Sequence, residues 1–361
     1  MTTQEEEQPT EYDLERISRA WRALMAYRGL SLQVFDSQVH SFEQLSAIHQ
    51  SLIPTLPIRL SHAAEAVEHN ADVIEKIADL AGIDSSFDPD EITPEQLEQT
   101  VADFPDVVDG LLAVVRDWSS LGAKDRSLTY DPIINALDEA VEDALTAGAV
   151  PDRNSFTVLV PGASLGRLSW ELARLGLSVQ GVEHSYLQLF MCNYVLNGTA
   201  TPENPLHLYP FAHHTGMIRS VDEQLKEVEF PDSDPRILEG AHFTMVAGEF
   251  LDLYDDPEKW DAIATCFSIE NSHSIISYIR RIAKILKVGG VWVNHGCLDF
   301  RYDDSLTETS VEITKDELDL VIARCGLRVI RREQLRCRPP YAVNGMISEE
   351  YESYLTVAVR V

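Results

Sequence analysis

The chain has 361 residues, with 29 Lys and Arg against 59 Asp and Glu, so its formal net charge at pH 7 is −30. A surface this acidic repels a polyanion, which argues against nucleic acid as the main partner. The hydrophobic fraction of 45% is that of an ordinary globular protein, and the length suggests two packed units or one large domain with additions.

The N-terminal part, residues 1–150, has the periodicity of helices. Apolar residues recur at steps of three and four over 12–33 and again over 58–80, and each stretch predicts a helix with one apolar face. Thr93 is a predicted N-cap for a later helix. Three shorter helices are expected over residues 93–103, 105–120 and 132–147. We therefore expect a helical N-terminal cap region.

From residue 154 onward, short apolar runs alternate with amphipathic stretches, which is typical of a parallel sheet covered on both faces. Strands are expected at 155–160, 177–183, 243–250, 260–267, 288–296, 326–333 and 353–361. Helices are expected at 165–176, 184–198, 272–287 and 314–325. Residues 199–241 are Pro-rich and aperiodic, which predicts an insertion over one end of the sheet. The pattern predicts a doubly wound α/β domain over 151–361.

Several features bear on location and on metals. No segment has the roughly 18 uninterrupted apolar residues of a membrane helix, and the acidic N-terminus lacks the apolar core of a secretory signal. The five cysteines form no CxxC pair, which favours a reducing compartment. We expect a location in the cytoplasm or nucleus and no membrane partner. No HxxxH or Cys/His spacing suggests a closed metal site, so no metal is expected.

The most informative segment is VLVPGASLGRLSWELARLGLSVQGVEHS, residues 158–185. An apolar strand runs into Gly162, a turn ends at Gly166 where a helix begins, and the next strand closes on Glu183. Small residues let a ligand approach the backbone, and an acidic residue about 20 positions on commonly holds ribose hydroxyls. Nucleotide-dependent dehydrogenases and methyltransferases share this signal, and a tight turn without a ligand also fits. The lack of a second comparable α/β unit favours methyl transfer.

Two later strand ends extend this candidate site. Glu249 and Phe250 end one strand, where the carboxylate is suited to accept from an adenine amino group and the ring to stack on the base. A solvated loop carboxylate is the alternative for Glu249. The next strand ends at Cys266, just before Glu270. Because ligands lie outside the carboxyl ends of strands in open α/β sheets, we expect these ends to meet in one cleft.

Taken in order, these segments resemble the carnosine N-methyltransferases and their fungal relatives. The resemblance covers roughly residues 116–361. Its most specific segments are RDWS (116–119), VPGASLGRLSWELARLG, GVEHS, FPDSDP (230–235), MVAGEF, WDAIATCFSIE and KILKVGGVWVNHG. The resemblance implies a seven-stranded, Rossmann-like methyltransferase sheet with a helical N-terminal region, S-adenosylmethionine as the cofactor, and a homodimer formed through the N-terminal helices.

Carried over residue by residue, the resemblance also implies cofactor contacts. These fall on Arg116, Gly162, Glu183, Glu249, Phe250 and Cys266, in addition to Gly166 at the end of the turn. Arg116 is suited to pair with the cofactor's carboxylate, and a structural ion pair is the alternative.

On the substrate side the chain departs from the family pattern. Glu270-Asn271-Ser272 stands where the family has an aspartate followed by Thr and Ala, and Arg301 replaces a histidine that contacts the dipeptide. Tyr341 matches the family. We therefore expect Glu270, Arg301 and Tyr341 to bind substrate, and the altered set leaves carnosine itself open as the acceptor.

Glu270 is also the predicted catalytic residue. A carboxylate there is suited to bond one imidazole N–H, which leaves the other ring nitrogen as an aimed lone pair. The alternative is that Glu270 caps the helix beginning near Ser272. The sequence predicts methyl transfer to an imidazole nitrogen of a small histidine-containing compound. Transfer to another small metabolite or peptide, and a non-catalytic cofactor-binding scaffold, remain as alternatives.

Overall fold

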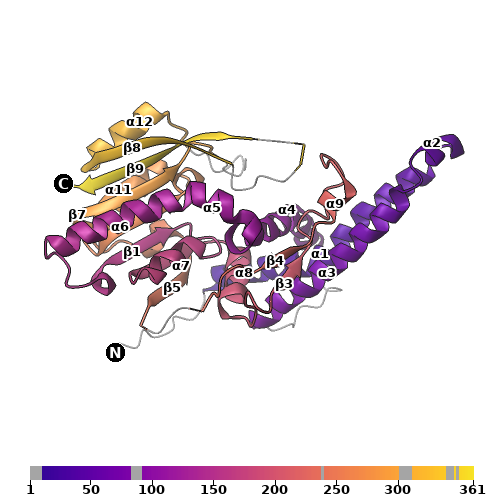
Figure 1. Ribbon diagram of the computed structural model, residues 1–361, viewed down its shortest axis with the longest axis horizontal. Helices are drawn as coiled ribbons and strands as arrows, with labels where there is room; N and C mark the ends of the chain where they lie inside the picture. The colour runs from indigo at the N-terminus through magenta and orange to yellow at the C-terminus, as the bar shows by residue number, and fades with distance from the viewer. Residues whose placement is uncertain (1–9, 83–91, 237–239, 301–310, 339–344, 347–348) are drawn as a thin grey trace. The chain divides into compact units, whose positions relative to one another are not determined.

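The computed structural model describes residues 10–82, 92–236, 240–300, 311–338, 345–346 and 349–361 (Figure 1). Contacts divide the chain into two compact units. The first contains Met1–Val115, Tyr186–Phe230 and Val343–Ile347, and the second contains Arg116–Ser185, Pro231–Ala342 and Ser348–Val361. This division differs from the single boundary near residue 150 that the sequence predicts, because the second unit already begins at Arg116 and the first unit takes in a later part of the chain.

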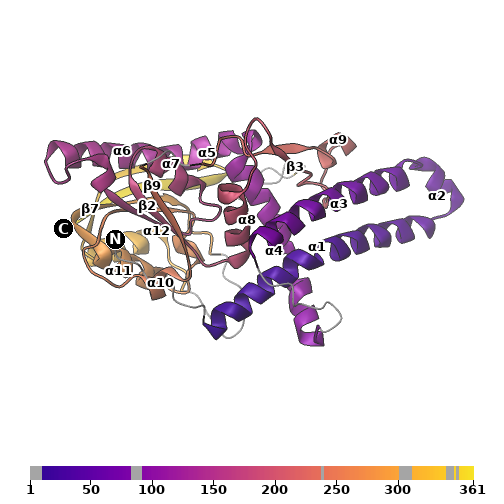
Figure 2. The same cartoon turned by 90° about the horizontal axis from the view of Figure 1, so that it is seen from below.

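A long helical hairpin dominates the first unit. Helices α1 (Glu11–Glu43) and α3 (Leu56–Leu80) run side by side and are joined through α2 (Ala47–Leu52), as Figures 1 and 2 show. The side chain of Thr10 caps α1 by accepting from the Asp13 backbone N–H. The apolar face of each helix is buried, which confirms both predicted amphipathic helices.

Helix α4 (Pro94–Trp118) corrects the prediction of two shorter helices over this region. Pro105 lies inside one continuous helix, since it removes only one backbone donor while apolar residues continue along the buried face on both sides. The predicted N-cap is confirmed: Gln96 N donates to Thr93 Oγ1 at 3.2 Å and Thr93 N donates to Gln96 Oε1 at 3.0 Å. Helix α8 (Tyr186–Asn197) packs in the same unit, where a Cβ on Gly110 would lie 2.7 Å from Met191 Sδ.

The segment expected to be an aperiodic insertion has secondary structure of its own. Strands β3 (Leu206–Leu208) and β4 (Val228–Phe230) pair in antiparallel fashion, and α9 (Val221–Gln224) lies between them in the chain. Asn70 of α3 accepts from Tyr209 N at 2.8 Å and donates to Tyr209 O at 3.0 Å. The expectation of an aperiodic segment is wrong for this part of the insertion, and the segment is bonded to α3.

The second unit is built on a seven-stranded sheet. Its strand order is β5-β2-β1-β6-β7-β9-β8, and β9 runs antiparallel to both neighbours. The strands are β1 (Thr157–Pro161), β2 (Ser178–Glu183), β5 (His242–Ala247), β6 (Trp260–Cys266), β7 (Leu286–Gly296), β8 (Leu327–Cys337) and β9 (Tyr351–Arg360). The order reverses between β1 and β6, which is where a doubly wound sheet opens a crevice. The predicted fold class is confirmed.

Helices cover both faces of this sheet. Ala262 and Ala264 of β6 join one core cluster with α6 (Asp131–Thr146) and α7 (Arg167–Arg174). Ile263 between them joins a second cluster with α10 (Phe250–Leu253), α11 (Ile275–Ile285) and α12 (Lys315–Arg324). Burial on both faces explains why the strands are continuous apolar runs. Within the described ranges, none of the helices has the length and apolar character needed to cross a bilayer.

Candidate active site

The turn after β1 lies at the carboxyl ends of the strands, where the order of the sheet reverses. Gly162 has a φ of 70°, and a Cβ there would lie 2.5 Å from Ser268 Oγ, a side chain that follows β6. Ser268 Oγ in turn donates to the carbonyl of Pro161 at 3.0 Å. Gly166, with a φ of 76°, is the N-cap of α7. Only glycine fits the first position, because Ser268 approaches the backbone there, and the approach of a ligand to this turn stays a prediction.

Glu183 ends β2 as a buried and firmly held carboxylate. Its Oε2 accepts from Ser164 N, and its Oε1 accepts from His184 N and Ser185 N, all at 2.9 Å. The imidazole Nδ1 of His184 also lies 3.3 Å from Oε1. Oε2, which accepts one bond from the turn, is the oxygen suited to a hydroxyl donor. These bonds fix Glu183 beside the glycine turn, which is the position predicted for an acid that binds ribose hydroxyls.

Arg116 at the end of α4 forms the structural ion pair that was its alternative role. Its Nε and Nη2 donate to the two oxygens of Asp117 at 2.8 and 2.9 Å, and Asp117 is fully buried. Nη2 also donates to Ser164 Oγ at 3.0 Å, which places the guanidinium at the glycine turn. Tyr130 donates to Asp117 Oδ1 at 2.8 Å, and burial raises the pKa of this phenol. The cation is therefore at the predicted site, and its contact with a cofactor stays a prediction.

Glu249 and Phe250 follow β5 but differ in exposure. Glu249 is exposed and is the N-cap residue of α10. Phe250 is buried, with its ring centroid 4.6 Å from that of Tyr278 and 6.0 Å from that of Tyr254. The Phe250 ring already packs against these two aromatic side chains, and its stacking on an adenine base stays a prediction.

Cys266 is the last residue of β6, and Glu270 lies in the segment that follows this strand. Burial raises the pKa of the Cys266 thiol, so this side chain is uncharged at neutral pH. Glu270 lies in a short 3-10 helix, Ile269–Asn271, with only 3% of its surface exposed. Its Oε2 has no hydrogen-bond partner among the described residues. Burial, followed by the charge of Asp299, raises the pKa of Glu270 to about 8.

The alternative role of Glu270 as a helix cap is not the one the structure supports. Ser274 is the N-cap of α11, and its side chain accepts from Ser277 N. A buried carboxyl without a partner is costly unless a proton or a ligand satisfies it, so such a group is a strong candidate for a functional residue. Arg301 and Tyr341, the other two predicted substrate residues, lie outside the described residues.

Sequence reasoning missed several residues that build the site. Asp117, Tyr130, Ser164 and Ser268 hold the predicted residues in place through hydrogen bonds across distant segments. Two signals were available: the RDWS segment contains Asp117, and the serine in the glycine turn is a side chain at an unusual position.

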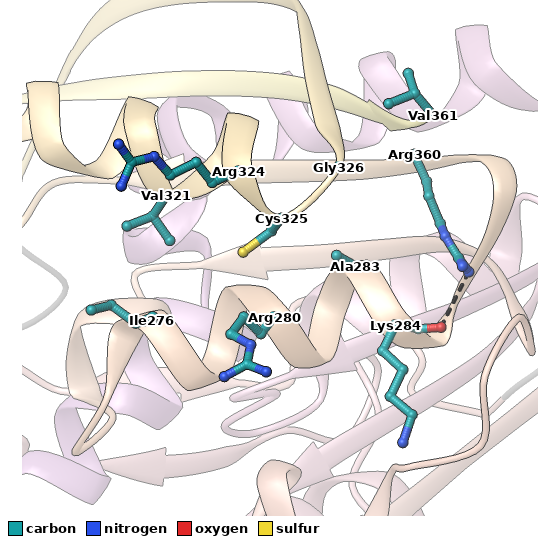
Figure 3. Close-up of a pocket in the computed structure, with 10 residues that line it drawn as sticks. All are labelled: Ile276, Arg280, Ala283, Lys284, Val321, Arg324, Cys325, Gly326, Arg360 and Val361. Carbon is teal, nitrogen blue, oxygen red and sulfur yellow. Dashed lines mark hydrogen bonds between the residues drawn. The ribbon is translucent and has the colours of Figure 1, made fainter.

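A second concavity lies between α11 and α12 and carries basic side chains (Figure 3). This open groove of about 670 Å³ is lined by Ile276, Arg280, Ala283, Lys284, Val321, Arg324, Cys325, Gly326, Arg360 and Val361. Arg360 donates to the carbonyl of Lys284 at 3.2 Å, at the end of α11. The groove therefore reaches the end of the sheet at which β7 begins. The glycine turn lies at the other end of the parallel strands, so the groove is separate from the candidate active site.

Comparisons with known proteins show to which family this chain is similar. The sequence matches the family described as Carnosine N-methyltransferase over residues 93–360. It is 32% identical to the Carnosine N-methyltransferase of Mus musculus over 358 residues, which cover 96% of this chain and 88% of the relative. It is 29% identical to that of Schizosaccharomyces pombe over 349 residues, which cover 90% and 91%. The solved magnesium protoporphyrin IX methyltransferase of Synechocystis PCC 6803 aligns with a TM-score of 0.36 and 13% identity, covering 64% of this chain and 84% of that one.

Proposed function

Because the chain belongs to the carnosine N-methyltransferase family, it is an S-adenosylmethionine-dependent methyltransferase, and we propose that it methylates an imidazole nitrogen of a small histidine-containing compound. The observation that carries this acceptor is the buried Glu270 carboxyl, whose Oε2 has no partner among the described residues. Glu270 also lies beside Gly296 at the end of β7, since a Cβ on that glycine would be 3.5 Å from Glu270 Oε1.

The residues of the glycine turn fit the cofactor. A Cβ at Gly162 would meet Ser268 Oγ, so glycine keeps the turn close to the end of β6, and Glu183 is a fixed carboxylate whose Oε2 is suited to a hydroxyl donor. We assign Glu183 to the ribose hydroxyls and Arg116 to the amino-acid carboxylate, and we place the backbone of Gly162 and Gly166 against the nucleoside. Glu249, Phe250 and Cys266 complete the proposed contact set. S-adenosylmethionine supplies an electrophilic methyl group on a sulfonium.

We assign Glu270 to the acceptor. In its ionised form, Oε2 accepts the N–H of one imidazole nitrogen, and this bond directs the lone pair of the other nitrogen toward the methyl group. When the second nitrogen has gained the methyl group, Glu270 takes the proton from the first nitrogen, so the product leaves as a neutral imidazole. Most of the rate acceleration then comes from orientation and exclusion of water, since a neutral ring nitrogen is already a nucleophile.

Methyl transfer from isotopically labelled S-adenosylmethionine tests this proposal. The acceptors are carnosine, histidine and a dipeptide in which phenylalanine replaces histidine, and products are identified by mass spectrometry. We expect label on an imidazole nitrogen and none on the phenylalanine dipeptide. Label confined to a compound without imidazole would retain the methyltransferase and overturn the acceptor. Binding of S-adenosylhomocysteine without turnover of any compound in a cell extract would favour the scaffold alternative.

We also propose that the first unit mediates homodimerisation. Apolar side chains gather at the end of the hairpin around α2, where Ile48 and Leu52 are each 74% exposed and Ile58 is 58% exposed. A cluster of exposed apolar residues of this kind is a common mark of an interaction surface. The resemblance to the family supports a second copy of the chain as its partner.

A further inference from the structure

Ser164 lies in the middle of the turn between β1 and α7 in an unfavourable conformation. Its φ is 51°, a left-handed value that glycine adopts freely and that serine adopts at an energetic cost. Gly162 and Gly166, on either side, meet the same backbone requirement as glycines. A side chain kept in a strained conformation at a ligand site points to a role for its polar atoms.

Both polar groups of Ser164 are bonded to residues assigned to the cofactor. Its backbone N–H donates to Glu183 Oε2 at 2.9 Å, and its Oγ accepts from Arg116 Nη2 at 3.0 Å. One residue of the turn thus connects the carboxylate at the end of β2 with the guanidinium at the end of α4.

The bond to Arg116 has a role that Asp117 cannot perform. Arg116 and Asp117 are neighbours in the chain, so the ion pair between them orients the guanidinium only within the end of α4. The hydrogen bond to Ser164 Oγ joins this guanidinium to the glycine turn. Because Nη2 donates both to Asp117 and to Ser164, the plane of the guanidinium is fixed from two elements.

We propose that Ser164 is a positioning residue for S-adenosylmethionine, with its hydroxyl setting Arg116 and its N–H setting Glu183 before the cofactor binds. The inference rests on the proposed roles of Arg116 and Glu183. Groups held in the bound geometry beforehand increase affinity because less ordering remains to be done on binding. The strain at Ser164 is retained because glycine would supply the turn without the hydroxyl.

Two substitutions separate this role from the turn itself. Ser164→Ala removes the hydroxyl and keeps the strained Cβ, whereas Ser164→Gly removes the hydroxyl and the strain together. We expect both variants to bind S-adenosylhomocysteine about tenfold more weakly by isothermal titration calorimetry, the loss of one charge-assisted hydrogen bond. In the free protein, the melting temperature of Ser164→Gly should exceed that of Ser164→Ala. Wild-type affinity in Ser164→Gly would overturn the proposal.

Glu258 offers a matched control, because it is a non-glycine residue with a φ of 56° just before β6, at the opposite end of the strand from the cleft. Glu258→Gly should likewise melt at a higher temperature than Glu258→Ala, and both should bind S-adenosylhomocysteine like the parent protein. Equal weakening by these controls would show that strain alone, and not the serine hydroxyl, sets the affinity.

A double-mutant cycle tests whether Ser164 acts through Arg116. In an Arg116→Ala background, we expect Ser164→Ala to change the affinity for S-adenosylhomocysteine by less than about twofold. A further tenfold loss in that background would overturn the positioning role and leave the assignment of Arg116 intact. If Arg116→Ala alone binds like the parent, the proposed role of Arg116 fails and the inference about Ser164 fails with it.

Discussion

At the scale of single residues, the burial of Glu270 determines the pH at which its carboxyl is ionised. Burial raises its pKa to about 8, so below that pH the carboxyl is mostly protonated and cannot accept an imidazole N–H. We expect the rate of methylation at low acceptor concentration to rise about tenfold per pH unit between about pH 7, where the acceptor imidazole is already mostly neutral, and about pH 8, and then to level off. Glu270→Gln should be about 100-fold slower, with no such rise and with unchanged affinity for S-adenosylhomocysteine. A flat pH profile for the parent protein would contradict this role.

The same residue predicts a pH dependence of stability. The folded-state pKa of Glu270 is raised from 4.5 to about 8, so between these values the folded protein binds a proton that the unfolded chain does not. Its stabilising contribution is complete below pH 4.5 and is lost as the pH rises through 8. Relative to Glu270→Gln, the parent should lose on the order of 4–5 kcal/mol of unfolding free energy between pH 4.5 and 9. Urea titrations of both proteins measure this difference, and a constant difference would contradict the raised pKa.

The sequence was sufficient to predict site residues at the carboxyl ends of strands, because ligands of open α/β sheets bind there. Gly162, Glu183 and Glu270 all stand just after apolar strands, so their approximate place was predictable. The network around Arg116 was not, because its partners come from three segments and only folding brings them together.

At the scale of elements, the turn after β1 tolerates little change at Gly162. Gly162→Ala adds a Cβ 2.5 Å from Ser268 Oγ at a φ of 70°, so both the turn and the packing against the end of β6 must shift. We expect it to abolish S-adenosylhomocysteine binding in calorimetry. Gly326→Ala is the matched control, since Gly326 has a φ of 81° with nothing within 4 Å of the added Cβ. Equal affinities of the two variants would show that the clash with Ser268 does not matter.

The FPDSDP segment has a structural role in the second unit. Asp232 pairs with Arg126 and, at 2.7 Å, with Arg167, whose guanidinium lies over the rings of both Trp118 and Trp170. Asp232→Ala takes a shared carboxylate away from two buried guanidinium groups, so it should cost about 3–5 kcal/mol of unfolding free energy in urea titrations. Asp232→Asn keeps one acceptor oxygen and should cost less. A loss below about 1 kcal/mol for the alanine variant would contradict this role.

Elements with strong periodicity were predictable and those set by tertiary contacts were not. The strands of the sheet and the helices between them agree with their apolar patterns, as do α1 and α3. The continuity of α4 through Pro105, and the β3–β4 pair, depend on packing within the first unit, which local pattern does not encode.

At the scale of the whole molecule, the apolar end of the hairpin predicts self-association. Charged substitutions at both Ile48 and Leu52 should convert a dimer to a monomer in light scattering coupled to gel filtration, because burying two carboxylates in an apolar interface is costly. The test is the double variant Ile48→Glu with Leu52→Glu. The control is the double variant Lys124→Glu with Lys226→Glu, at two exposed positions. A parent protein that is monomeric at tens of micromolar would contradict the proposed dimer.

The most direct test of the account is the transfer of label from S-adenosylmethionine to carnosine and histidine by the parent protein and by Glu270→Gln at pH 8.5. The account predicts label on an imidazole nitrogen with the parent and about a 100-fold lower rate with the variant, at equal affinity for S-adenosylhomocysteine. Equal rates in the two proteins, or label only on compounds that lack an imidazole, would contradict it.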